Sequence, residues 1–272
     1  VRELGLPEKL FKELSQPATL VGEVKPEIAE EIGYTTKIVL TATHDTASAV
    51  MAVPETGCPL YISSGTWSLL GIESPVAIAT KEALDANFTN EGGYNRSTRF
   101  LKNIMGLWMI QSVRREHEKK YSWGDYVVMA KAVKDFDSIV DVNDQRFLAP
   151  QSMIEAIRDY CRETHQKVPE TPGELALCVY DSLAVCYAKA VKVVENITGY
   201  KFNTIHIVGG GSMNGYLNEL TAKRTGLKVM AGPVEATAIG NIIAQLLFDG
   251  AVKDIDTAKN LVKDSFDVET IG

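Results

Sequence analysis

A histidine and an aspartate stand side by side at positions 44 and 45, at the end of the apolar run KIVLTAT. Such a run predicts a strand, whereas Asp is poor inside strands and common at strand ends and helix caps. Asp45 therefore has two interpretations. It caps a helix beginning in THDTASAV, or it holds a sugar hydroxyl and accepts its proton, which requires only placement within hydrogen-bond reach.

Two further stretches could receive phosphate groups. GGGSMN (209–214) is neither a Walker loop nor a G-x-G-x-x-G motif, but glycines let a ligand approach the backbone and the following helix offers free N–H groups. A plain tight turn explains it equally well. SSGTWS (63–68) places hydroxyl groups around a glycine, where they could donate to phosphate oxygens. Hairpin turns also favour Ser and Gly for their own geometry, so this motif is weak alone.

Two amides complete the candidates. TRFLKNIMGLWMIQSVRREHEKK (98–120) is expected to form one helix, in which Asn103 and Gln111 share a face beside a gap left by Gly106. Amides among apolar neighbours suggest a ligand with hydrogen-bonding edges, such as a nucleotide, although a helix boundary facing water is the simpler explanation. No histidine pair has metal-ligand spacing, so no metal site within the protein is predicted.

The elements that must position these residues are clearest in the last third. NTIHIV, NGYLNELTAKRTG, LKVMA and TAIGNIIAQLLFDG alternate strand and helix, with the turns GGGS and GPVEA between them. Short connections of this kind predict parallel strands, with ligands beyond their carboxyl ends. PLYISSGTWSLLGIES predicts a hairpin, and a capping box at Thr171–Glu174 begins a long helix that ends at Gly199.

The chain is therefore expected to contain one α/β domain. Regular structure is expected to begin at Lys37, so that residues 37–272 form the domain. Residues 1–36 are interrupted by Pro17, Gly22 and Pro26 and are expected to be the tail of a preceding domain.

The composition of the chain limits the classes of function and partner that are expected. The chain has 272 residues, 45% of them hydrophobic, which is enough for a sizeable core. A net charge of −7 argues against nucleic acid or an anionic membrane as a partner. No run of eighteen apolar residues occurs. The four cysteines show neither CxxC spacing nor a disulfide-rich pattern, which favours a reducing, cytoplasmic compartment.

The order of these stretches resembles the C-terminal half of the FGGY family of carbohydrate kinases. The matching stretches span residues 43 to 241 and are HDTASAV, YISSGTWSLLG, NFTNEGG, RFLKNIMGLWMIQ, RFLAP, VGGGSMN and AGPVEATAIGN. The resemblance implies an actin-like ATPase (ribonuclease H-like) fold, with a mixed sheet flanked by helices. It implies transfer of the ATP γ-phosphate, with Mg²⁺ neutralising the phosphates. It is closest to members that phosphorylate L-rhamnulose at its 1-hydroxyl.

The same resemblance assigns roles to individual residues. They are a catalytic base, Asp45; sugar contacts, His44 and Thr46; a phosphate contact, Thr66; nucleotide contacts, Asn103 and Gln111; and a glycine against the adenosine, Gly210 or Gly211.

One departure from the family pattern concerns the other half of the enzyme. The family's first domain carries an Asp-x-Gly phosphate loop, and nothing resembling it precedes Asp45. The resemblance therefore implies half of a bilobal enzyme, with the missing N-terminal domain as its partner. Such a half should be inactive alone, because positioning supplies most of the catalysis in phosphoryl transfer. The alternatives are a fuculose or xylulose kinase of the same family and a non-catalytic nucleotide-binding module, against which the presence of Asp45 argues.

Overall fold

The computed structural model describes residues 2–272, which form two separate sheets and ten α-helices. The strands are β1 (Thr19–Glu23), β2 (Lys37–Leu40), β3 (Tyr61–Ser64), β4 (Trp67–Ser74), β5 (Thr89–Gly92), β6 (Thr98–Met105), β7 (Thr204–Val208), β8 (Lys228–Ala231) and β9 (Glu269–Ile271). The helices are α1 (Pro26–Ile32), α2 (Asp45–Met51), α3 (Lys81–Asp85), α4 (Trp108–Glu116), α5 (Trp123–Ala132), α6 (Met153–Glu163), α7 (Pro172–Thr198), α8 (Gly215–Thr225), α9 (Ala236–Asp249) and α10 (Ile255–Ser265). Short 3₁₀ turns lie at Glu8–Leu10, Tyr94–Arg96, Gln145–Phe147 and Gly210–Met213.

The central sheet is mixed and has the strand order β5-β6-β4-β3-β7-β8-β9. The pairs β3–β7 and β7–β8 are parallel, and the other neighbours are antiparallel. The predicted hairpin is confirmed as β3 and β4. The predicted alternation in the last third is confirmed as β7, α8, β8 and α9, and the predicted capping box at Thr171 begins α7.

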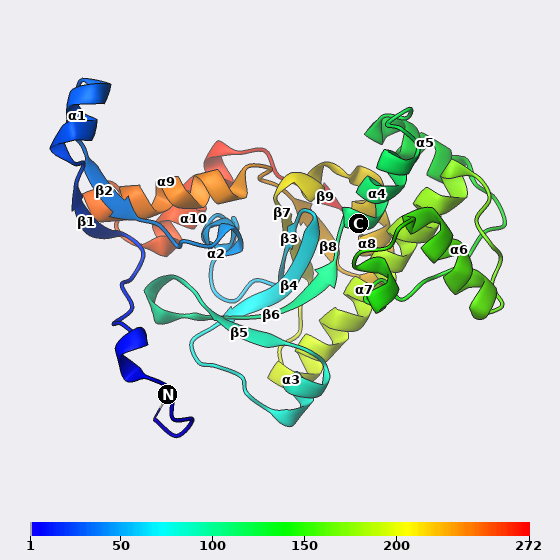
Figure 1. Ribbon diagram of the computed structural model, residues 1–272, viewed down its shortest axis with the longest axis horizontal. Helices are drawn as coiled ribbons and strands as arrows, with labels where there is room; N and C mark the ends of the chain where they lie inside the picture. The colour runs from blue at the N-terminus through cyan, green and yellow to red at the C-terminus, as the bar shows by residue number, and fades with distance from the viewer. Residues whose placement is uncertain (1) are drawn as a thin grey trace.

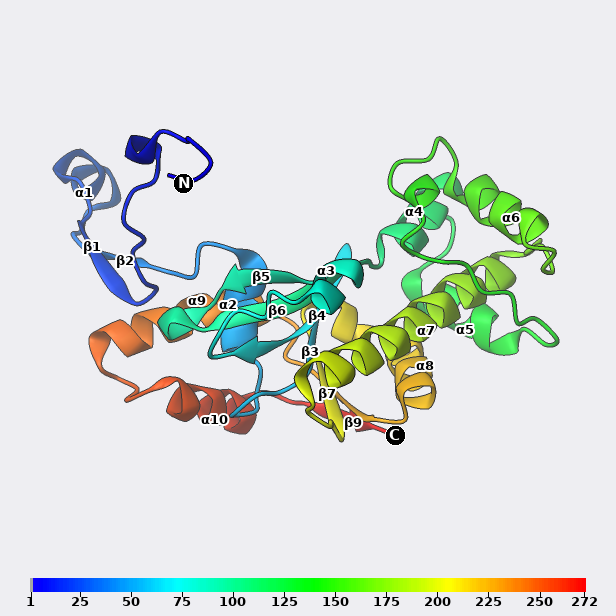
Figure 2. The same ribbon diagram turned by 90° about the horizontal axis from the view of Figure 1, so that it is seen from below.

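Helices cover both faces of this sheet (Figures 1 and 2). Alternate residues of β3 face opposite layers, as a strand requires. Ile62 packs into the core shared with α7 and α8, while Tyr61 packs into a smaller core shared with α2, α9 and α10. The expected α/β fold, with a mixed sheet flanked by helices, is therefore confirmed.

The single helix expected over residues 98–120 is wrong. Its first part is β6, which pairs with β4 along its whole length, and only α4 in its second part is helical. Phe100, Leu101 and Ile104 are all buried, although Leu101 points to the opposite face of β6 from the other two. A strand buried on both faces loses the alternation that distinguishes it from a helix, so the apolar spacing was misleading. Asn103 and Gln111 therefore lie on different elements.

Regular structure also begins earlier than expected. β1 pairs antiparallel with β2, and α1 lies between them in sequence. Pro26 occupies the first turn of α1, where its missing N–H removes no helical hydrogen bond, and Gly22 stands at an irregularity in the β1–β2 ladder. Pro26 and Gly22 are therefore part of regular structure and do not interrupt it, contrary to expectation. Residues 2–40, here called the arm, stand off the central sheet in both views (Figures 1 and 2).

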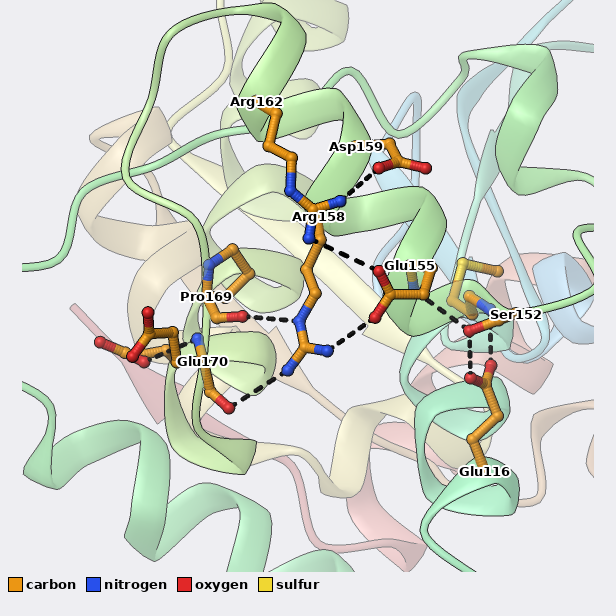
Figure 3. Close-up of polar contacts among 10 residues, drawn as sticks. Glu116, Ser152, Glu155, Arg158, Asp159, Arg162, Pro169 and Glu170 are labelled. Carbon is orange, nitrogen blue, oxygen red and sulfur yellow. Dashed lines mark hydrogen bonds and ion pairs between the residues drawn. The ribbon is translucent and has the colours of Figure 1, made fainter.

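Polar contacts hold the helices beyond the end of the sheet together (Figure 3). Glu116, the last residue of α4, accepts hydrogen bonds at the start of α6 from the Ser152 hydroxyl (2.6 Å) and the Met153 N–H (2.5 Å). Arg158 of α6 donates from Nε to the carbonyl oxygen of Pro169 (2.9 Å), in the loop that leads to α7. Helices α4 and α6 and the loop before α7 are thus linked by charged side chains that form hydrogen bonds with backbone groups.

A buried ion pair attaches α10 to the sheet. Lys259 Nζ lies 3.1 Å from Glu73 Oε2 of β4, and the two side chains are 4% and 17% exposed. The other carboxylate oxygen of Glu73 accepts from the Ser97 hydroxyl (3.1 Å). Removing one partner of such a pair leaves a charge without compensation in a medium of low dielectric constant.

We therefore expect Lys259→Met to lower the free energy of unfolding by about 3 kcal/mol. Lys263→Met, at an exposed position of the same helix, is the matched control and should change it by less than about 0.5 kcal/mol. Urea denaturation of both variants measures the difference. Equal stabilities would mean that the buried pair does not hold α10 in place.

Candidate active site

A pocket of ≈ 660 Å³ opens at the carboxyl ends of β3 and β7, within the size range of small-molecule sites. It gathers residues from five stretches of the chain: His44, Asp45 and Thr46; Ser63, Ser64, Gly65, Thr66, Trp67 and Leu69; Asn103; Gly209 and Gly210; and Val234, Glu235 and Thr237. The position agrees with the rule that ligands of such sheets bind beyond the strand ends. Six of the eight residues predicted for the site line this pocket; Gln111 and Gly211 do not.

Asp45 is the first residue of α2 and its carboxylate is largely exposed. His44 is the N-cap residue of α2, and no side chain makes a capping hydrogen bond there. Asp45 Oδ1 accepts from the adjacent Thr46 N–H (2.6 Å) and lies 3.4 Å from His44 Nδ1, with the two side chains 54% and 78% exposed. Among residues 2–272, no hydrogen bond reaches Oδ2. Asp45 is therefore not the N-cap residue, although its Oδ1 satisfies one N–H of the first turn of α2, and Oδ2 remains available at the pocket.

The hydroxyl-bearing hairpin is held by the segment before α4. The Leu107 N–H donates to the Gly65 carbonyl and the Trp108 N–H to the Thr66 carbonyl, each at 3.1 Å. A Cβ at Gly106 would lie 2.7 Å from the Thr66 oxygen and 2.6 Å from the Trp67 carbonyl carbon. The expectation of a gap beside Gly106 is therefore wrong, because the hairpin backbone occupies that space. This packing fixes the turn from which Thr66 is exposed to the pocket.

The two glycines of the GGGSMN turn that could not be separated in the sequence differ in the structure. Gly210 lines the pocket, and a Cβ there would meet nothing within 4 Å. Gly211 is buried behind it, where a Cβ would overlap the side chain of Ser64. Gly209 adopts a φ of 87°, which favours glycine. Gly211 therefore joins the turn to the hairpin, while Gly210 leaves open space for a ligand.

The two amides reach different environments. Asn103 is exposed and lines the pocket from β6, opposite Leu69 of β4. Gln111 lies on α4, is half-buried, and does not line the pocket.

Sequence reasoning did not assign three apolar residues of the pocket to the site, namely Trp67, Leu69 and Val234. Trp67, 42% exposed, and Leu69 both face it from β4, while Ser68 and Leu70 between and beyond them are buried. The two-residue period of a strand was the available signal, because positions 67 and 69 of a strand share a face. The Ser68 hydroxyl pairs with the Tyr187 hydroxyl of α7 at 2.6 Å, and burial raises the pKa of Tyr187 so that its hydroxyl stays neutral.

The charge of the pocket is one-sided. Its two carboxylates are Asp45 and Glu235, and none of the described residues that line it is Lys or Arg. No group of three His, Cys, Asp or Glu side chains within residues 2–272 could hold a metal ion. An anionic ligand would here be met by hydroxyl, amide, ring N–H and backbone N–H donors, without a Lys or Arg among the described lining residues.

Comparison with known proteins identifies relatives of the whole chain. The C-terminal domain of the FGGY family of carbohydrate kinases matches residues 60–247. A rhamnulokinase from Oceanobacillus iheyensis is 49% identical over 270 residues, and one from Halalkalibacterium halodurans is 50% identical over 269 residues. Each alignment covers 99% of this chain and 57% of the relative, so the chain spans about half the length of these curated relatives.

Solved structures share the fold at low sequence identity. The gluconate kinase from Lactobacillus acidophilus superposes with a TM-score of 0.70 at 13% identity, over 99% of this chain and 54% of that one. The Plasmodium falciparum glycerol kinase with ADP gives 0.65 at 13% identity, over 93% and 50%. The expected actin-like ATPase fold is thereby confirmed.

None of the helices within residues 2–272 combines the length and the apolar character of a membrane span.

The two glycines of the turn give a test of this geometry. Gly211→Ala should lower the free energy of unfolding by about 1–3 kcal/mol, because its methyl group overlaps Ser64. Gly210→Ala should change it by less than about 0.5 kcal/mol. Thermal and urea unfolding of the two variants compare them directly. A Gly211→Ala protein as stable as Gly210→Ala would disprove the close packing of turn and hairpin.

Proposed function

Because the chain belongs to the FGGY family of carbohydrate kinases, matching its C-terminal domain, we propose that it forms the second half of a rhamnulokinase. The reaction is transfer of the ATP γ-phosphate to the 1-hydroxyl of L-rhamnulose. Identity near one half with two rhamnulokinases, along nearly the whole chain, supports this sugar over fuculose or xylulose. The ≈ 660 Å³ pocket with a carboxylate at its edge supports a catalytic function over that of a non-catalytic nucleotide-binding module.

The observation that carries this proposal is the carboxylate of Asp45. It lines the pocket, is largely exposed, and does not occupy the N-cap position of α2. In the proposed reaction, Asp45 accepts the proton of the sugar hydroxyl as that oxygen attacks the γ-phosphate. His44 and Thr46, its neighbours in the pocket, are the proposed sugar contacts.

The proposed nucleotide side is formed by other residues of the same pocket. Thr66 donates to the phosphates from the hairpin, Asn103 contacts the nucleotide, and Gly210 lies against the adenosine. Gly211 acts indirectly, through its packing on Ser64. Gln111 would meet the nucleotide only where it extends beyond the described pocket.

The residues fit Mg·ATP in one specific respect. With two carboxylates and no Lys or Arg among the described residues that line the pocket, the phosphate charge needs an added cation. Mg²⁺ suits this, because it is commonly bound by one or two carboxylates together with substrate phosphates. It supplies charge neutralisation when bound. The chain itself supplies the proton acceptor, the phosphate-facing hydroxyls and the open backbone at Gly210.

We also propose that residues 1–36 belong with a preceding domain. None of residues 2–45 is buried. The arm carries eleven of the twenty-three exposed large apolar side chains of the described chain: Leu4, Leu6, Leu10, Phe11, Leu14, Leu20, Val21, Ile28, Ile32, Tyr34 and Ile38. Such a concentration marks an interaction surface. The relatives extend well beyond the aligned part, and a domain there would cover the arm.

The role of Asp45 is tested by Asp45→Asn in an enzyme that contains both halves. Asn keeps an oxygen that can accept the Thr46 N–H but cannot take a proton. We expect kcat to fall by about 10²–10⁴-fold, with the melting temperature and ATP affinity nearly unchanged. Steady-state kinetics with L-rhamnulose and Mg·ATP measure the effect. Retention of most of the turnover would remove Asp45 from the role of base.

The nucleotide side is tested by Gly210→Val in the same enzyme. The valine side chain enters the open space at Gly210, so ATP binding should weaken by at least about tenfold while the fold survives. Calorimetric titration with ATP measures the affinity, and Gly210→Ala provides a smaller substitution at the same position. An unchanged ATP affinity in a folded Gly210→Val enzyme would show that this turn does not contact the nucleotide.

A further inference from the structure

The strand before Asp45 does not fix it in the pocket. The strand predicted before Asp45 is confirmed as β2, but it pairs with β1 outside the central sheet. Four residues separate the end of β2 at Leu40 from α2, and one of them, Thr43, has a positive φ of 58°. Asp45 therefore does not stand at the end of a strand of the central sheet. Another element must hold it in place.

That element is α9, which packs directly against α2. The Ser48 hydroxyl of α2 donates to Asn241 Oδ1 at 2.8 Å. A Cβ at Gly240 would overlap the Ser48 carbonyl oxygen, so the two backbones are in direct contact there. One turn earlier on α9, the Thr237 hydroxyl donates to the Asp45 carbonyl oxygen at 3.1 Å. Thr237, Gly240 and Asn241 have the three-to-four spacing of a single helix face.

Thr237 differs from the other two in its second environment. It lines the pocket together with Asp45, whereas Gly240 and Asn241 do not. It is also the second residue of α9 and directly follows the turn that contributes Val234 and Glu235 to the pocket. The Thr237 hydroxyl therefore links the start of α9, which lines the pocket, to the backbone of Asp45.

We propose that Thr237 is a positioning residue for the base, an inference that rests on the proposed role of Asp45. Its hydroxyl restrains the first turn of α2 and so sets where the Asp45 carboxylate lies relative to the sugar hydroxyl. Without it, Gly240 and the Ser48–Asn241 bond still hold α2 on α9, so the fold persists while the first turn gains freedom. Misplacement of a reacting group by about 1 Å can cost about 10²-fold in rate.

The test compares variants of the enzyme with both halves, using L-rhamnulose and Mg·ATP. Thr237→Val, and Thr237→Ala as a second variant without the hydroxyl, should lower kcat by about tenfold or more. The KM values for both substrates should stay within about twofold, and Thr237→Ser should restore most of the turnover. Ser48→Ala removes the other hydroxyl bond between α2 and α9. It should lower the melting temperature and keep kcat near that of the wild type.

The outcomes separate this inference from the proposed function. Wild-type kcat in both Thr237→Val and Thr237→Ala, beside an impaired Asp45→Asn enzyme, overturns the positioning role alone. A raised KM for ATP at unchanged kcat also overturns it, because Thr237 would then act as a nucleotide contact. A similar kcat loss in Ser48→Ala would overturn it in favour of general loosening of α2. A wild-type enzyme without sugar kinase activity overturns the proposed function and this inference together.

Discussion

At three places around the pocket a neighbouring segment lies directly against the backbone of a glycine, and each contact requires that glycine. Gly240 brings α9 onto α2, Gly106 brings the start of α4 onto the hairpin, and Gly211 brings the glycine turn onto the same hairpin. A side chain at any of the three would overlap its neighbour or force it to shift. These contacts hold segments that carry Asp45, Thr66 and Gly210, all of which line the pocket. The geometry of the pocket thus depends on contact distances that only glycine permits.

The scaffold behind the pocket is a mixed sheet between two helical layers. The layer with α7 and α8 carries most of the apolar core, and the Tyr187–Ser68 contact connects α7 to β4, the second strand of the hairpin. The layer with α2, α9 and α10 is smaller and is tied to the sheet by the buried Lys259–Glu73 pair. Burial in that smaller layer also lowers the pKa of His206 to about 4, so its imidazole is neutral near pH 7. Both layers are thus closed by specific polar contacts as well as by apolar packing.

The residues that line the pocket provide hydroxyls, open backbone and two carboxylates, but none of those described is Lys or Arg. The arm, with its exposed apolar side chains, projects from the same chain (Figure 1). Both features are consistent with a bilobal enzyme in which a second domain covers the arm and faces the pocket. In the proposed phosphoryl transfer, where electrostatic stabilisation is a major contribution, the positive charge would have to come from a bound cation or from the proposed second domain.

The sequence by itself determined the elements that carry strong local signals. The capping box at Thr171, the helix end at Gly226 and the β3–β4 hairpin were predictable because each depends on residues a few positions apart. The order of the motifs also indicated the family, and six of the eight residues predicted for the site line the pocket. Only the tertiary structure decided that Asn103 lies on a strand, that Gly210 rather than Gly211 faces the pocket, and that Thr237 contacts Asp45. Thr237 and Asp45 are 192 positions apart, and such contacts follow from how closely packed backbones approach, which local propensities do not encode.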